Sequence, residues 1–226
     1  MAKLRLFYIF SLLIPFTGIA QEEDSLATRR MITPSIYIDY GKLLTLPSNF
    51  ESKYEFGAEI LIAEKFPVIV EFGNGQLTPK SAYANGTYTS SGNYFRVGAG
   101  IVTAIDAKNN IGLSFRYAVA TFDEVGEYSI ESESGKQDSY SQSINRKNLN
   151  ATWYEAVIFS ERKIIFRDKE GEEWNWNPLS FGFNFRMRVL ATRDKFDPID
   201  VYAIPGYGRS FDKVIPAMNL FLKVSF

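Results

Sequence analysis

The side chains best placed for chemistry are the carboxylates of Glu55 and Glu59, which stand four positions apart in a segment of alternating polar and apolar residues. In an extended strand such positions share one face, and paired carboxylates can act as general acid and base. The chain has no His, which removes the commonest general base, any Ser–His–Asp arrangement and a His-based zinc site. We therefore predict a non-enzymatic protein and interpret both glutamates as members of a salt-bridge network.

Charges of both signs gather on one face of the alternating segments, whereas the opposite face is apolar. The predicted interior network comprises Asp39, Glu55, Glu59, Glu71 and Glu155 with Arg96, Arg116, Arg186, Arg188 and Lys223. Buried ions are costly without partners, so a closed interior requires near-equal numbers of acids and bases. The balance predicts a salt-bridged interior that does not conduct ions.

No cofactor and no metal ion are predicted. The acidic runs at 131–134 and 170–173 lack the alternating ligand spacing of a calcium loop. The glycine-containing segment 206–210 has neither the Lys nor the spacing of a phosphate loop, so it is predicted to be a turn. A net charge of −1 gives no basic footprint for nucleic acid, and no nucleic-acid partner is expected.

Apolar residues recur at every second position over most of the chain, a period that only a strand converts into two distinct faces. The predicted strands cover residues 35–41, 54–62, 68–73, 94–101, 111–119, 153–167, 179–189 and 217–226. In the sixth of these, Arg162 falls on the apolar face, which predicts a bulge or an early end there. A separate strand at 164–167 would raise the count from eight to ten.

The connections between these strands alternate in length. Short ones at 63–66 and 106–110 alternate with long ones at 74–93 and 123–150, as do the periplasmic turns and external loops of outer-membrane barrels. The connection at 169–178 is long for a periplasmic turn. We predict an all-β fold, an eight-stranded antiparallel up-and-down transmembrane β-barrel. The loops predicted to face the outside are 74–93, 123–150 and 191–215.

The first residues indicate export. Lys3 and Arg5 precede an apolar run at 6–14, and small residues close the segment, as in a secretory signal peptide. No Cys occurs in the chain, so no lipid-anchored lipoprotein is expected. The predicted divisions are a signal peptide at 1–20, an N-terminal lead at 21–33 and the barrel at 34–226. Export and a closed sheet together predict the bacterial outer membrane, with its lipid as the surrounding partner.

The last strand ends on an aromatic residue with apolar residues at every second position. These residues are Leu220, Leu222, Val224 and Phe226. The pattern resembles the last strand of bacterial outer-membrane barrels, which the barrel assembly machinery reads. The resemblance implies that this machinery is a partner.

Longer segments resemble one family. Residues 153–157, 180–188 and 202–208, together with the closing Phe226, look like a family of small Bacteroidota outer-membrane β-barrel proteins of unknown function. The most specific part is the turn at 204–208. The family carries no assigned catalytic residues, and its segment after Trp153 is one long strand, which favours eight strands over ten.

Several alternatives remain open at this stage. Alternation alone does not separate a membrane barrel from a soluble β-sandwich, in which the apolar face would meet a second sheet. A soluble periplasmic lipocalin-like protein that carries an apolar ligand is the second functional hypothesis, although the charged inner face argues against it. A lipid-modifying enzyme is the third. The leading hypothesis is a structural, adhesive or partner-docking barrel, with an envelope protein or surface partner contacting its loops.

Overall fold

The computed structural model describes residues 31–43, 51–80, 82–130, 138–168, 170–174 and 176–226. The predicted signal peptide at 1–20 and all but the last three residues of the predicted lead at 21–33 lie outside the described residues. The middle of one predicted loop, 131–137, also lies outside them.

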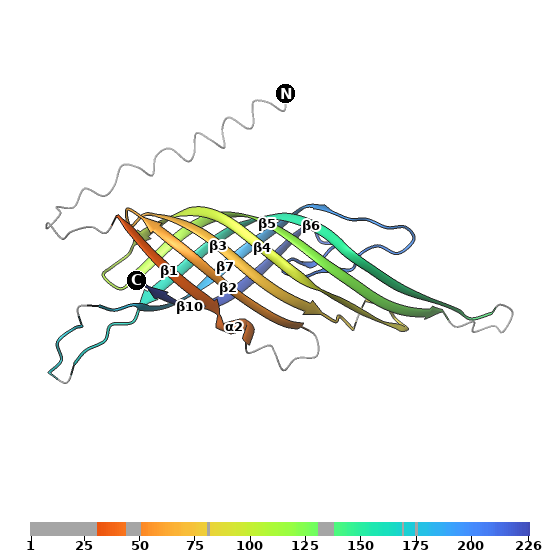
Figure 1. The fold of residues 1–226 in the computed structure, drawn as a ribbon, viewed down its shortest axis with the longest axis horizontal. Helices are drawn as coiled ribbons and strands as arrows, with labels where there is room; N and C mark the ends of the chain where they lie inside the picture. The colour runs from red at the N-terminus through yellow and green to blue at the C-terminus, as the bar shows by residue number, and fades with distance from the viewer. Residues whose placement is uncertain (1–30, 44–50, 81, 131–137, 169, 175) are drawn as a thin grey trace, which may run out of the picture.

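Eight antiparallel strands form a sheet that closes on itself in a ring of hydrogen bonds (Figure 1). The strands are β1 (Ile32–Asp39), β2 (Glu51–Ile62), β3 (Phe66–Leu77), β4 (Gly86–Ala104), β5 (Asn109–Ile130), β6 (Tyr140–Lys163), β7 (Leu179–Arg193) and β10 (Val214–Ser225). Closure comes from pairing of β1 with β10, in which Tyr37 stands opposite Lys223. The prediction of eight strands in an all-β fold is confirmed, and the ring is not a sandwich of two sheets.

Smaller elements lie in the connections. They are the single helical turn α2 (Tyr40–Leu43) and a two-stranded sheet of β8 (Ala203–Ile204) and β9 (Gly208–Arg209). The segment 164–167 is not a strand of the ring: the Ile164 N–H donates to the Leu179 carbonyl of β7, and Arg167 forms an isolated bridge with Glu173. The described part of the chain contains no helix of the length and apolar character needed to cross a membrane.

The two faces of the ring differ as the alternation predicts. Outward side chains of the strands are large, apolar and exposed, as in Val68, Val70 and Phe72 of β3. Inward side chains are polar or charged and buried, as in Glu71 of the same strand. Arg162, near the end of β6, points outward and is exposed, and the strand ends one residue later. The predicted early end of this strand is therefore observed.

Several strands are longer than predicted, which corrects the predicted loops at 74–93 and 123–150. β3 continues to Leu77 and β4 begins at Gly86, while β5 continues to Ile130 and β6 begins at Tyr140. The added segments are rich in Ser, Gly, Thr and Tyr, which hid their strand character. Backbone pairing does not require apolar side chains, and in this region β5 pairs with β4 on one side and with β6 on the other. They form a tall wall on one side of the ring (Figure 1).

The connections alternate between the two ends of the ring because neighbouring strands are antiparallel. One end carries the connections at 63–65, 105–108 and 164–178, and the two ends of the described chain meet there, with the Phe226 N–H donating to the Pro34 carbonyl. We call this the terminal end. The opposite end, or loop end, carries the connections that follow β1, β3, β5 and β7, of which residues 40–43, 78–80, 82–85, 138–139 and 194–213 are described.

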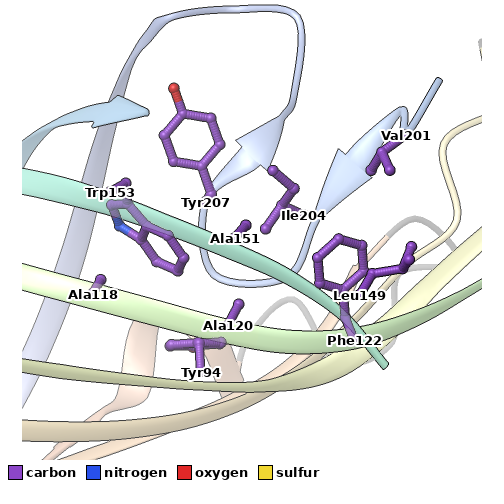
Figure 2. Packing of buried hydrophobic residues seen from close by; sticks show 10 residues of the cluster. All are labelled: Tyr94, Ala118, Ala120, Phe122, Leu149, Ala151, Trp153, Val201, Ile204 and Tyr207. Carbon is purple, nitrogen blue, oxygen red and sulfur yellow. The ribbon is translucent and has the colours of Figure 1, made fainter. Parts of the chain in front are cut away.

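The connection at 194–213 does not lie wholly outside the ring, which corrects the predicted external loop at 191–215. Its β8–β9 hairpin turns inward, and Val201, Ile204 and Tyr207 are completely buried. They pack in one cluster with Tyr94 and Trp153 from the wall (Figure 2). The hairpin therefore fills the interior at the loop end.

Small side chains on the wall make room for this hairpin. Ala118 and Ala120 of β5 and Ala151 of β6 are buried beneath it (Figure 2). Its turn contains Gly206 with φ +80°, where an added Cβ would lie 2.5 Å from the Tyr94 ring. Both the backbone conformation and the close approach require glycine at this position.

We expect Gly206→Ala to lower the free energy of unfolding by about 2 kcal/mol or more, because it combines left-handed backbone strain with a clash. Gly171→Ala is the matched control, since Gly171 has φ +87° but no atom within 4 Å of its would-be Cβ. That variant should lose only the backbone contribution of about 1 kcal/mol. Denaturant unfolding followed by fluorescence measures both. Equal losses of unfolding free energy in the two variants would contradict the tight packing of the hairpin.

Candidate functional site

The centre of the ring is the carboxylate of Glu71, which three guanidinium groups surround. Arg116 approaches it at 2.5 Å, Arg186 at 2.8 Å and Arg96 at 3.2 Å. The Tyr37 hydroxyl donates a further hydrogen bond at 2.8 Å. The partners come from strands on several sides of the ring, and Glu71 is 1% exposed. Such a carboxylate remains charged only because its partners replace water.

Two further carboxylates extend this cluster. The first, Glu55, lies 2.9 Å from Arg96, 3.1 Å from Arg186 and 3.1 Å from Lys53. It also accepts a 2.8 Å hydrogen bond from the Tyr94 hydroxyl. Each oxygen of Glu55 therefore has at least one cationic partner.

The second, Glu155, lies 2.8 Å from Nε of Arg96 and accepts a 2.7 Å hydrogen bond from the indole N–H of Trp153. Arg186 and Arg188 each stand 3.4 Å from it. Arg96 thus contacts Glu55, Glu71 and Glu155 at once. We call this set of linked groups the central network.

A second, smaller group lies nearer the terminal end. Lys223 stands between Glu59 at 2.8 Å and Glu161 at 2.6 Å, and the Ser180 hydroxyl donates to Glu161 at 2.7 Å. No ion pair described in the structure joins this group to the central network. Among the described ion pairs, Lys223, Glu59 and Glu161 therefore form a cluster separate from the central network.

The structure places all ten residues of the predicted network inside the ring, and all are buried. It brings seven of them into the central network: Glu55, Glu71, Arg96, Arg116, Glu155, Arg186 and Arg188. Asp39 reaches it through Asn219, whose amide donates to both Asp39 and Glu55. Glu59 and Lys223 belong to the second cluster.

Several interior residues were not predicted. Lys53 lies one residue before the predicted strand 54–62, on the same face as Glu55, so a slightly longer strand would have included it. Glu161 lies within the predicted strand 153–167 and shares the face of Glu155, but it was not assigned to the network. Glu124, which pairs with Arg146 at 2.6 Å, was hidden in a predicted loop. The hydrogen-bonding aromatic residues Tyr37, Tyr94 and Trp153 carried no sequence signal, because an inward aromatic residue looks like any core residue.

The central network also holds the inserted hairpin. Arg96 donates to the Gly206 carbonyl at 3.1 Å, and Arg188 donates to the Tyr207 carbonyl at 3.0 Å. A buried turn would otherwise leave these carbonyls without donors, at a cost in free energy. The charges therefore stabilise the hairpin as well as one another.

An ion pair stabilises the 194–213 connection, which contains the hairpin. Arg193 donates to both oxygens of Asp200, at 2.5 and 2.6 Å. Burial raises the pKa of the Asp200 carboxyl, but hydrogen bonds from Arg193 and from the N–H groups of Val201 and Phe196 outweigh this effect. The pKa of Asp200 therefore lies below its ordinary value, and the pair is intact at neutral pH.

Layers of side chains follow one another inside the described part of the ring. The hairpin fills the loop end, and the central network follows it. Next come Ile69, Phe159 and Phe221, beside a void of about 10 Å³ that has room for at most about one water molecule. Arg116 of the central network and Glu59 and Lys223 of the second cluster also line this void. Among the described residues, no group of three or more metal-ligating side chains could hold a metal ion.

We expect Glu71→Gln to lower the free energy of unfolding by about 3–5 kcal/mol, because it leaves three guanidinium groups around a neutral amide. The matched control is Glu173→Gln, which removes an ion pair with Arg167 whose side chains are 50% and 57% exposed. The control should change stability little. Denaturant midpoints compare the two. A small effect of Glu71→Gln would contradict the stabilising role of the central network.

Comparison with known proteins gives a family but no activity. The model of a family described as a domain of unknown function, DUF6048, matches residues 3–218, which is nearly the whole chain. A search of curated proteins finds no match. No functional residue is therefore transferred from a relative. By this match the chain belongs to the DUF6048 family of domains of unknown function.

Proposed function

We propose that this protein is a non-enzymatic, eight-stranded outer-membrane β-barrel that acts through the surfaces at its ends. One observation carries the proposal: the ring is apolar outside and charged inside. This is the reverse of a protein that folds in water, and it matches a sheet whose outer face meets lipid.

The outer face supports lipid contact. Exposed apolar side chains occur on neighbouring strands around the ring, as in Phe56 of β2, Phe95 of β4 and Phe115 of β5, each at least 43% exposed. Monomeric soluble proteins rarely expose contiguous apolar patches larger than a few hundred Å². The closed ring also leaves no free strand edge within this belt, as hydrocarbon requires.

The inner face argues against the soluble alternative. A lipocalin-like carrier needs an apolar cavity for its ligand, whereas ion pairs occupy the centre of this interior and the inserted hairpin occupies its loop end. The wide apolar hollow beside Ala58 lies on the outer face, among Ile36, Val70 and Phe72. It is part of the surface that we assign to lipid.

The two ends suggest an orientation. The terminal end carries the short turns at 63–65 and 105–108, which match the periplasmic side of outer-membrane barrels, whereas its third connection, at 164–178, is longer. Leu220, Leu222 and Val224 are only partly buried on the outer face, and Phe226 is 52% exposed. These side chains are therefore accessible to the barrel assembly machinery. The resemblance of this strand to the last strand of bacterial outer-membrane barrels also implies that the machinery is a partner.

The loop end then faces the cell exterior. There the wall of β4, β5 and β6 rises beyond the shorter β1 and β10 (Figure 1). The rising part exposes Val125, Ile130 and Tyr140, and side chains of this kind are suited to a protein partner. We propose that docking or adhesion takes place on this wall.

Membrane fractionation tests the location. We expect the full chain in the outer-membrane fraction, with a gel band that shifts on boiling because a closed sheet resists detergent until heated. Recovery in the soluble periplasmic fraction without a shift would overturn the proposal.

Two arginine substitutions on the outer face, one inside and one outside the proposed lipid belt, test whether lipid surrounds the ring. Val70→Arg places a charge in the middle of the proposed belt, and we expect it to cost about 2–4 kcal/mol of stability in lipid vesicles. Val125→Arg makes the same change on the rising wall, where the side chain is 52% exposed, and it should cost about 0–1 kcal/mol. If both variants lost equally little stability, water rather than lipid would surround the ring.

A further inference from the structure

A cavity opens inside the ring at the terminal end. It has a volume of about 330 Å³, which lies in the range of pockets for small ligands. Every strand of the ring contributes at least one residue to its lining. We call it the vestibule. The vestibule is a property of the closed sheet itself, so it exists whether lipid or water surrounds the ring.

The bottom of the vestibule is polar and held in place. Glu59, Glu161 and Lys223 line it, each less than 10% exposed, and their mutual ion pairs fix their positions. The Ser180 hydroxyl and the Phe159 ring also line it. Fixed carboxylate, ammonium and hydroxyl groups can donate and accept hydrogen bonds without further ordering, which favours binding of a polar molecule.

An aromatic side chain stands at its rim. Trp176 lines the vestibule and is 55% exposed, and the next residue, Asn177, lines it too. Asn177 accepts a 2.7 Å hydrogen bond from the Phe166 N–H and donates at 2.8 Å to the Trp174 carbonyl. The 164–178 connection, which projects from the ring near the C-terminus (Figure 1), thereby carries Trp176 on a hydrogen-bonded scaffold.

An exposed indole ring beside the polar groups of the vestibule matches one kind of ligand. A pyranose sugar has an apolar C–H face that packs against an aromatic ring, while its hydroxyl groups need donors and acceptors such as carboxylates, amides and ammonium groups. The lining side chains include three carboxylates, those of Glu59, Glu64 and Glu161, against two ammonium groups, those of Lys163 and Lys223. This excess of negative charge disfavours acidic sugars.

We propose that the vestibule binds a saccharide without acidic groups, with Trp176 packed against one face of a pyranose ring. The site goes beyond the function proposed above, which concerns the outer face and the loop end. If the terminal end faces the periplasm, the site is open to the glycans of that compartment.

Tryptophan fluorescence tests the site directly, because the chain has only three Trp residues. Trp153 is completely buried, so acrylamide quenching reports mainly on Trp174 and Trp176. The full chain in amine-oxide micelles, whose head group contains no sugar, is titrated with chitotriose. We expect saturable protection from quenching and a weaker response to glucuronic acid.

Two variants locate the binding. Trp176→Ala should weaken chitotriose binding about tenfold or more, because truncating a central aromatic contact removes much of the binding energy. Trp174→Ala is the matched control, since Trp174 is equally exposed but packs against Phe166, with ring centroids 5.6 Å apart, and does not line the vestibule. It should leave affinity unchanged.

Three results would overturn the proposal. They are the absence of saturable binding, equal losses in the two variants, and quenching of Trp176 by brominated lipid with no response to saccharide, which would assign this side chain to the membrane interface. A heat-shifted gel band for each variant shows that the ring is closed. Failure of the saccharide site is then distinguishable from failure of the barrel.

Discussion

The burial of Glu71 among Arg96, Arg116 and Arg186 is the interaction on which the rest of the structure depends. These four residues come from β3, β4, β5 and β7, so one cluster of charges ties together much of the ring. Because side chains alternate along a strand, a register slip of one residue would turn these ions outward and bring apolar side chains in. The cost of leaving any one ion unpaired therefore specifies the register of several strands at once.

The same requirement explains the charge balance of the interior. Seven acids and six bases are among the buried residues, and Arg146 supplies a further base beside Glu124. A guanidinium carries five N–H groups, so an arginine can pair with a carboxylate and still donate to other acceptors. Arg96 and Arg188 use some of theirs on the carbonyls of the inserted hairpin. Charge pairing and closure of the loop end are thus parts of one hydrogen-bonded structure.

In the function that we propose, partners contact the surfaces at the ends of the ring. Cations hold the carboxylates of the central network, and the hairpin packs inside the loop end. What remains accessible is different at each end. The loop end offers a tall wall with exposed apolar and aromatic residues, and the terminal end offers a polar vestibule with Trp176 at its rim. These surfaces differ in chemistry, which is why we assign them different partners.

The period-two alternation was enough to predict eight strands, the apolar outer face and ten inward charges, because burial on a strand depends on a pattern within a few residues. The same alternation places Lys53 and Glu161 on the inner face, although neither was assigned to the network. The alternation failed where Ser, Gly and Tyr replaced apolar residues, so β4, β5 and β6 were predicted too short.

Only the tertiary structure decided which charges meet and where the hairpin lies. Arg186 and Glu71 are 115 residues apart in the chain, and their contact depends on strand order and closure rather than on either segment. The inward path of Tyr207 likewise depends on a recess formed by Ala118, Ala120 and Ala151 from two other strands. Local sequence describes the faces of a strand, whereas partners across a closed ring are set by the three-dimensional arrangement of all eight.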